Sequence, residues 1–315
     1  MSRRPAVAAL GGGHGLFASL QALQYVTDQI TAIVTVADDG GSSGRLREEF
    51  DILPPGDLRM ALAALCDPSE WGLQWRDALQ HRFAGDGPLG GHPLGNLMIA
   101  SLWDLLGDPV AGLDLVGRLV EARGRVLPMA IEPVRIEAQV RGADPDQPEQ
   151  ISTVTGQVKV ATTTGDVLSV GLHPDPPRPC TEALDAVGDA DWIVLGPGSW
   201  FTSVIPHLLV PDLRDALVHT KARRLLTLNV TMHTGETAGY TAADHLEVLA
   251  AHAPELHLDV VLADPSVVTD SGDQLRDAAQ SLGATVVFTQ VADSDAPGTH
   301  DPLRLAAAYR DIFEL

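Results

Sequence analysis

The residues with the clearest potential for chemistry lie in one segment, 37–45, which follows the apolar run 30–36. The segment combines two carboxylates (Asp38 and Asp39) with glycines, two serines and the guanidinium of Arg45. Glycines let backbone N–H groups approach a phosphate, while serine and arginine side chains donate to its oxygens. The carboxylates would repel a phosphate, so we expect them to face a ribose hydroxyl, a metal ion or a proton in transfer. An unliganded turn needs only one or two such residues, and the segment is therefore interpreted as a ligand-binding loop.

A second glycine loop, 11–15, follows the short apolar run 5–10 and precedes a helical pattern that continues to about Val26. A strand, a glycine turn and a helix in this order place a phosphate at the helix N-terminus. The dinucleotide fingerprint is not met cleanly, because its last glycine should stand where the chain has Leu16. In a dinucleotide interpretation, Asp38 or Asp39 would contact the ribose. His14 is either a ligand contact or a capping side chain.

Two more polar loops, 196–203 and 229–237, follow predicted strands. The carboxyl ends of parallel strands share one edge of the sheet, so these two loops should meet the first two there and form a ligand crevice. Ser199 lacks the flanking glycines of a nucleophile elbow. Trp200 and Phe201 either line the crevice or pack in the core, and core packing is favoured.

Isolated side chains add further candidates. Asp57 and Arg59 open a predicted helix after Pro-Pro-Gly; Asp57 is either a helix cap or, with Asp38, a ligand of Mg²⁺, which takes few protein ligands. Arg59 would bind a phosphate or a carboxylate. Asn96 could contact a base or a sugar, or cap a helix, and Glu236 could accept a hydrogen bond from a sugar hydroxyl or be a surface acid.

We therefore expect ligand contacts from glycines, hydroxyls, acids and cations of all these segments. They are Gly11, Gly12, Gly13, His14, Gly15, Asp38, Asp39, Gly40, Gly41, Ser42, Ser43, Gly44, Arg45, Asp57, Arg59, Asn96, Gly196, Pro197, Gly198, Ser199, Thr202 and Glu236. Asp38 and Asp39 are the candidates for catalysis, should the protein be a transferase. No cofactor is expected to be obligatory, and Mg²⁺ is the one cation considered. His92 has no neighbouring histidine at metal-ligand spacing, so a zinc site is not expected.

The elements that position these residues alternate between strand and helix, which predicts an α/β, Rossmann-like, doubly wound and mostly parallel sheet. From about 126 to 175 the pattern changes to short alternating runs, which predicts an inserted antiparallel β subdomain. We expect one domain over residues 1–315 that contains this insert.

Composition narrows the function classes. The 315-residue chain has a formal net charge of −21, which argues against nucleic acid or an anionic membrane surface as a partner. Two cysteines give neither a disulfide framework nor a metal motif. No apolar run has the length of a signal peptide or a membrane span, and a cytoplasmic location is expected. Apolar residues in 113–120 suit a core or a homo-oligomer interface equally.

The combination of motifs resembles the YvcK-like gluconeogenesis factor family within the CofD-like superfamily. The motifs are Gly-Gly-Gly-His-Gly-Leu, Val-Thr-Val-Ala-Asp-Asp-Gly-Gly-Ser-Ser-Gly-Arg, Pro-Pro-Gly-Asp-Leu-Arg, Gly-His-Pro-Leu-Gly-Asn-Leu, Gly-Pro-Gly-Ser-Trp-Phe-Thr-Ser and Gly-Glu-Thr, in this order. The resemblance implies a cytoplasmic Rossmann-like protein that binds UDP-sugars such as UDP-N-acetylglucosamine. It also implies a regulatory role that links gluconeogenic carbon metabolism to cell-wall precursor supply and cell shape, through a protein partner.

The resemblance leaves a second function open, because the related CofD branch transfers a phospholactyl group from a nucleotide-activated donor with a divalent cation. A weaker third alternative is an NAD-dependent oxidoreductase. Two positions depart from the family pattern: His14 replaces a threonine, and Thr299 replaces a basic residue before His-Asp. Both departures bear on ligand affinity and preference.

Overall fold

The computed structural model describes residues 3–144, 146–231, 235–268 and 272–315. Its main sheet is parallel and has the strand order β10-β9-β8-β7-β1-β2-β3. The strands are β1 (Val7–Gly11), β2 (Ile30–Val34), β3 (Arg125–Pro128), β7 (Trp192–Leu195), β8 (Arg223–Thr227), β9 (Val260–Ala263) and β10 (Thr285–Phe288). The strands β2 and β3 follow β1 on one side, and the strands β8, β9 and β10 follow β7 on the other side. The strand order therefore reverses between β1 and β7, and open α/β sheets bind ligands at such a reversal.

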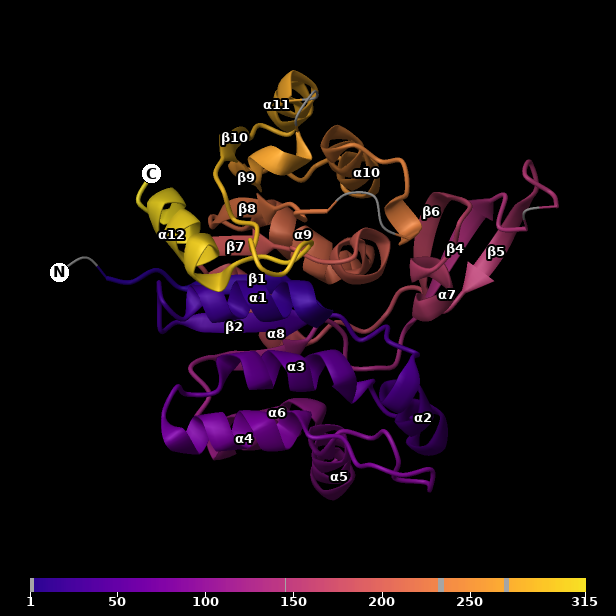
Figure 1. Cartoon of the computed structure of the whole chain (residues 1–315), viewed down its shortest axis with the longest axis vertical. Coiled ribbons are helices and arrows are strands. Elements are labelled where there is room, and N and C mark those ends of the chain that lie inside the picture. The colour runs from indigo at the N-terminus through magenta and orange to yellow at the C-terminus, as the bar shows by residue number, and fades with distance from the viewer. Residues whose placement is uncertain (1–2, 145, 232–234, 269–271) are drawn as a thin grey trace.

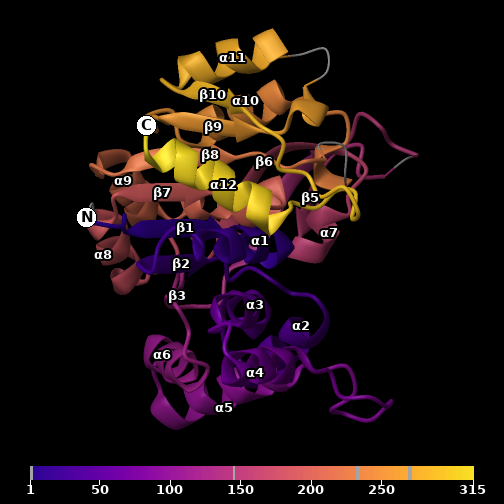
Figure 2. The same ribbon diagram turned by 60° about the vertical axis from the view of Figure 1, so that its left-hand side comes forward.

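Helices cover both faces of the main sheet (Figures 1 and 2). On one face, α1 (Gly13–Leu23) packs against α3 (Pro55–Leu65) and the C-terminal helix α12 (Pro302–Phe313). On the other face, α8 (Thr181–Asp189) packs against α9 (Pro211–His219). The central strands are buried on both sides, as in β1, where all five residues are buried. The prediction of a doubly wound, mostly parallel α/β fold is confirmed.

In the described residues, six further helices flank this core. They are α2 (Gly41–Phe50), α4 (Glu70–Gln80), α5 (Leu94–Leu106), α6 (Pro109–Leu119), α10 (Ala242–His252) and α11 (Gly272–Ser281). The helices α2 to α6 all lie between β2 and β3 in the sequence, and they form a group below the sheet in Figure 2. Shorter helical turns are η1 (Trp200–Val204), η2 (Ile205–Leu209), η3 (Gly235–Thr237) and η4 (Pro265–Val267).

The insert is a three-stranded antiparallel sheet, β5-β4-β6, that stands beside the main sheet (Figure 1). It consists of β4 (Arg135–Arg141), β5 (Ile151–Thr155) and β6 (Asp166–His173), with the short helix α7 (Gln157–Ala161) between β5 and β6. The expected start at residue 126 is too early, because β3 pairs in parallel with β2 and belongs to the main sheet. Four residues are too short a run to separate an edge strand from the alternating strands that follow it.

Candidate functional site

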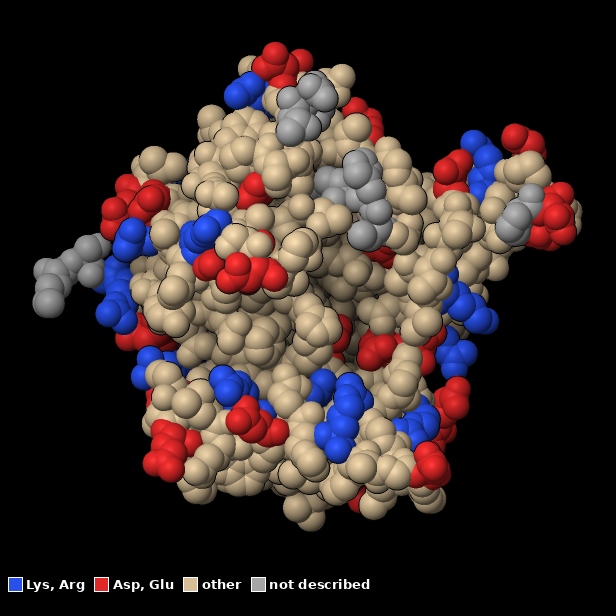
Figure 3. All heavy atoms as spheres, in the orientation of Figure 1, with Lys and Arg blue, Asp and Glu red and all other residues tan. Residues whose placement is uncertain are grey.

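Two adjoining cavities open at the carboxyl edge of the main sheet, next to the reversal between β1 and β7. Their volumes are about 700 Å³ and about 370 Å³. Both are lined by His14, Gly15, Ala161, Gly198 and Ser199, which makes them two compartments of one crevice. In Figure 3 this face of the molecule is hollowed near its centre, between the main sheet and the insert. A ligand in the crevice would therefore contact both parts of the fold.

The N-terminus of α1 forms the floor shared by the two compartments. Gly12 is the N-cap residue and Gly13, with φ of +56°, begins the helix. A side chain at Gly15 would collide with the carbonyl oxygen of Pro197, so only glycine allows the 11–15 and 196–199 loops to approach this closely. His14 lies one position past the start of the helix and is exposed to the crevice. Free N–H groups and the helix dipole at this point favour an anion.

Asp57 occupies part of this N-terminus. Its carboxyl group accepts a hydrogen bond from the Gly13 N–H, and it lines the smaller compartment. It does not cap its own helix, since the N-cap residue of α3 is Pro54. Burial, reinforced by the nearby charge of Asp38, raises the pKa of Asp57 to about 7. Asp57 therefore exchanges a proton in the neutral range, directly beside the predicted phosphate position.

The carboxylates of the 37–45 loop are held by backbone and hydroxyl groups. Asp38 accepts from the N–H of Gly40 at 2.9 Å and from the hydroxyl of Ser43, and burial raises its pKa. Asp39 accepts from the N–H of Val158 at 3.1 Å, in the first turn of α7. Asp39 thus fastens the insert to the main fold. Neither carboxylate lines the two compartments.

Ser42, Arg45, Arg59 and Asn96 were also predicted as ligand contacts, but they do not line the crevice. The Ser42 hydroxyl lies 2.7 Å from Nδ1 of His92 and accepts from Nδ2 of Asn96 at 2.9 Å. These contacts join Ser42, His92 and Asn96 in one buried hydrogen-bonded group. The guanidinium of Arg45 donates to the carbonyl of Gly90 at 2.9 Å, and that of Arg59 donates to Oε1 of Gln80.

The loops after β7 and β8 form the opposite wall. Asn229 ties them together, because its amide accepts from the N–H of Gly198 at 2.9 Å and donates to the carbonyl of the same residue at 2.8 Å. Glu236 is only 6% exposed, which excludes a surface acid. Its carboxyl group accepts from the N–H of Phe201 at 2.9 Å, and burial raises its pKa to about 7. Residues 232–234 of the predicted 229–237 loop lie outside the described residues.

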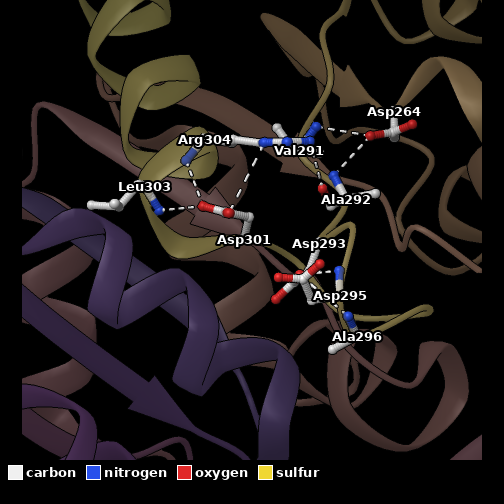
Figure 4. Close-up of polar contacts among 9 residues, drawn as sticks. All are labelled: Asp264, Val291, Ala292, Asp293, Asp295, Ala296, Asp301, Leu303 and Arg304. Atoms are coloured by element: carbon white, nitrogen blue, oxygen red, sulfur yellow. Dashed lines mark hydrogen bonds and ion pairs between the residues drawn. The ribbon is translucent and has the colours of Figure 1, made fainter.

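The C-terminal loop completes the larger compartment with residues 297–300. Figure 4 shows how carboxylates hold this loop: Asp264 accepts from the N–H groups of Val291 and Ala292, both at 2.8 Å. Asp301 accepts from the first turn of α12 and caps that helix. His300 is buried and its Nε2 lies 3.1 Å from the carbonyl of Leu228. Thr299 and His14 both line this larger compartment.

The structure thus brings part of the predicted set to the crevice and leaves the rest outside it. The lining members are Gly12, Gly13, His14, Gly15, Asp57, Gly198, Ser199, Thr202 and Glu236. The members that do not line it are Gly11, Asp38, Asp39, Gly40, Gly41, Ser42, Ser43, Gly44, Arg45, Arg59, Asn96, Gly196 and Pro197. Trp200 and Phe201 are buried as expected, and Trp200 also lines the larger compartment.

Sequence reasoning did not assign several lining residues to the site. Asn229 and Thr231 belonged to a recognised loop but were not selected from it. Gln157 and Ala161, from α7, carried no signal, because nothing in an isolated five-residue helix indicates that it folds over a distant glycine loop. The 297–300 segment was noted only for its departure from a family pattern.

The described residues contain neither a cluster of metal ligands nor a membrane-spanning helix. No group of three or more His, Cys, Asp and Glu side chains is placed to hold a metal ion together in that part of the chain. No helix in the same residues combines the length and apolar character needed to cross a bilayer. A third cavity of about 570 Å³, between α2 and α5, is mainly apolar and contains none of the predicted site residues.

Comparison with known proteins identifies the family of this chain. The family model described as 2-phospho-L-lactate transferase CofD matches residues 7–294. A putative gluconeogenesis factor of Mycobacterium tuberculosis is 53% identical over 97% of this chain and 90% of its own length. The chain belongs to the gluconeogenesis factor family, within the CofD family. The gluconeogenesis factor of Bacillus subtilis is 38% identical over 86% of this chain and 82% of its own length.

A solved structure agrees with this membership. A UPF0052-family protein from Bacillus halodurans matches with a TM-score of 0.83 and 34% identity, over 98% of this chain and 99% of that one. This solved structure and the present chain therefore share their fold over nearly their whole lengths.

Proposed function

We propose that this protein binds a nucleotide sugar, such as UDP-N-acetylglucosamine, in the crevice beside α1. The two-compartment shape of the crevice carries the proposal. A nucleotide sugar has a charged diphosphate at its centre and a largely uncharged ring system at each end. The helix N-terminus and the Gly198–Ser199 backbone lie where the compartments meet, which suits the diphosphate. The two compartments, of about 700 and 370 Å³, would take the nucleoside and the sugar.

Polar groups suited to ring hydroxyls and amides line the larger compartment. Asn229, Thr231 and Thr237 contribute an amide and hydroxyls, and Glu236 contributes a carboxyl group. A small number of fixed polar groups within a concave site is the usual basis of specificity for small ligands. The loop after β8 thus supplies the donors and acceptors that a sugar or a base requires.

A regulatory role is the second part of the proposal. The relatives are named gluconeogenesis factors, and a protein of that name that senses a cell-wall precursor would link carbon metabolism to wall supply and cell shape through a protein partner. The insert suits such signalling, because α7 lines both compartments and is fastened to the main fold by Asp39. Ligand binding would stabilise this contact.

The competing function is a CofD-type transfer reaction, and one observation favours it. Asp38 and Asp57 lie close enough for the charge of the first to raise the pKa of the second. With ligand phosphates present, this pair would hold Mg²⁺, which keeps several waters and uses few protein carboxylates. The cation would neutralise charge that develops on a transferred phosphoryl group.

Calorimetric titration separates the two functions. The purified protein is titrated with UDP-N-acetylglucosamine and with GDP, each in Mg²⁺ and in EDTA. Saturable binding of the UDP-sugar that persists in EDTA, with the ligand recovered unchanged, supports the sensor. Binding of GDP alone and only in Mg²⁺ would contradict it and favour the transferase.

A further inference from the structure

The charges that line the crevice present a problem for an anionic ligand. Among the described residues that line the two compartments there is no lysine or arginine, whereas Asp57 and Glu236 are both acidic. The two predicted phosphate-binding guanidinium groups, Arg45 and Arg59, are hydrogen bonded to other groups away from the crevice. The whole chain adds a formal charge of −21. A diphosphate therefore needs a source of positive charge beyond the N-terminus of α1.

His14 is positioned to supply that charge. Its side chain is exposed and lines both compartments, so it lies at the point where they meet. It stands in the first turn of α1, where a bound phosphate would also meet free backbone N–H groups. A protonated imidazole carries a positive charge and donates hydrogen bonds from both ring nitrogens, which suits phosphate oxygens.

Among the described residues, the other titratable groups of the crevice do not replace it. Asp57 of α3 and Glu236 of η3 bring no positive charge in either protonation state. His300, in the C-terminal loop, is buried beside the Leu228 carbonyl, and burial lowers its pKa. The residues of α7 that line the crevice, such as Gln157 and Ala161, carry no charge.

We propose that His14 is a specificity-determining residue of this site: its imidazolium binds the ligand's diphosphate and makes the site select nucleoside diphosphates over uncharged nucleosides. This inference rests on the proposed function, since it assigns the phosphate contact within the same crevice. It adds a pH-dependent component that a fixed cation would not give, with tighter binding at lower pH.

The test compares UDP with uridine in calorimetric titrations at pH 6 and pH 8. His14→Ala removes the imidazole, His14→Lys replaces it with a permanent charge, and His257→Ala, at an exposed histidine outside the crevice, is the matched control. We expect His14→Ala to weaken UDP binding about tenfold or more at pH 6, the range of a charge-assisted hydrogen bond, with a smaller effect at pH 8 and none on uridine. His14→Lys should restore UDP binding at both pH values.

Asp57 and Glu236 also bind protons as the pH falls, so the pH dependence of UDP binding by the wild type does not by itself show that His14 is responsible. The comparison of His14→Ala with His14→Lys isolates the contribution of His14, because both variants keep Asp57 and Glu236. If His14→Ala binds UDP as the wild type does at both pH values, the inference is wrong.

A second measurement keeps the two proposals distinguishable. The imidazole resonance of His14 is followed by NMR as a function of pH, with and without inorganic pyrophosphate. A pKa that rises on addition of pyrophosphate supports the phosphate contact, even if UDP-sugars fail to bind and the proposed function falls. A His14 pKa that pyrophosphate leaves unchanged contradicts it.

Discussion

The carboxyl group of Asp57, in the first turn of α3, accepts a hydrogen bond from the backbone N–H of Gly13 at the start of α1. The helix N-terminus that the sequence marks for a phosphate is therefore already in contact with one acid. A carboxylate there and a bound phosphate would repel each other. Ligand binding must be accompanied by a proton on Asp57, a cation beside it, or a cost in affinity.

Replacement of Asp57 by asparagine should strengthen binding of an anionic ligand. The asparagine oxygen still accepts from Gly13, but the negative charge is gone. We expect Asp57→Asn to bind UDP several-fold more tightly than the wild type at pH 8 in EDTA, and equally at pH 5, where the wild-type acid is protonated. Calorimetry at the two pH values measures this, and weaker binding by the variant at pH 8 would contradict it.

The same substitution should change how stability depends on pH. The pKa of Asp57 is about 7 in the folded protein and 3.8 in the ordinary, unfolded state, so the folded state holds a proton that the unfolded state loses between these values. This group therefore lowers the free energy of unfolding as the pH rises from about 4 to 7. At about 1.4 kcal/mol per pKa unit, Asp57→Asn should add up to about 4 kcal/mol at pH 8 and little at pH 4. Urea unfolding tests this, and equal stabilisation at both pH values would exclude the acid as the cause.

Gly15, in the floor of the crevice, is a position with no room for a side chain. A Cβ there would collide with the carbonyl oxygen of Pro197, so either the loop or the helix must move. We expect Gly15→Ala to destabilise the fold by about 1–3 kcal/mol, the range for overpacking, and to weaken ligand binding. Gly188→Ala, in α8, is the control, because a Cβ there meets nothing within 4 Å and alanine favours a helix. A Gly15→Ala protein as stable as this control would show that the contact is not tight.

Asp39 should act on the insert rather than on the ligand. Its carboxylate accepts from the Val158 N–H and so fastens the first turn of α7. We expect Asp39→Ala to cost about 1 kcal/mol, as for the loss of a helix cap, and to speed hydrogen exchange in residues 156–162. Exchange in β8 should be unchanged and serves as the internal reference. Unaltered exchange in the α7 segment would refute the fastening role.

The sequence was sufficient to predict the parallel sheet and the glycine loop at α1, because buried strands and glycine turns have local signals. For the 37–45 loop, ligand contact stays a prediction, but the sequence did not indicate how the carboxylates of the loop are held. They accept hydrogen bonds from Gly40 and Val158, and Val158 lies 119 positions from Asp39 in the chain. Such a long-range contact leaves no trace in local composition. The contacts of Arg45 and Arg59 could not be predicted for the same reason, since their partners, Gly90 and Gln80, become neighbours only on folding.

The most direct test of the central claim is a calorimetric titration of the wild type and of Ser199→Trp with UDP-N-acetylglucosamine. Ser199 is exposed and lines both compartments, so an indole there would fill the space in which they meet. Ser281→Trp, on the exposed surface of α11, is the matched control. We predict saturable binding to the wild type and to Ser281→Trp, and its loss in Ser199→Trp with the fold intact by circular dichroism. Absence of binding to the wild type, or equal binding by Ser199→Trp, would contradict a nucleotide-sugar site in this crevice.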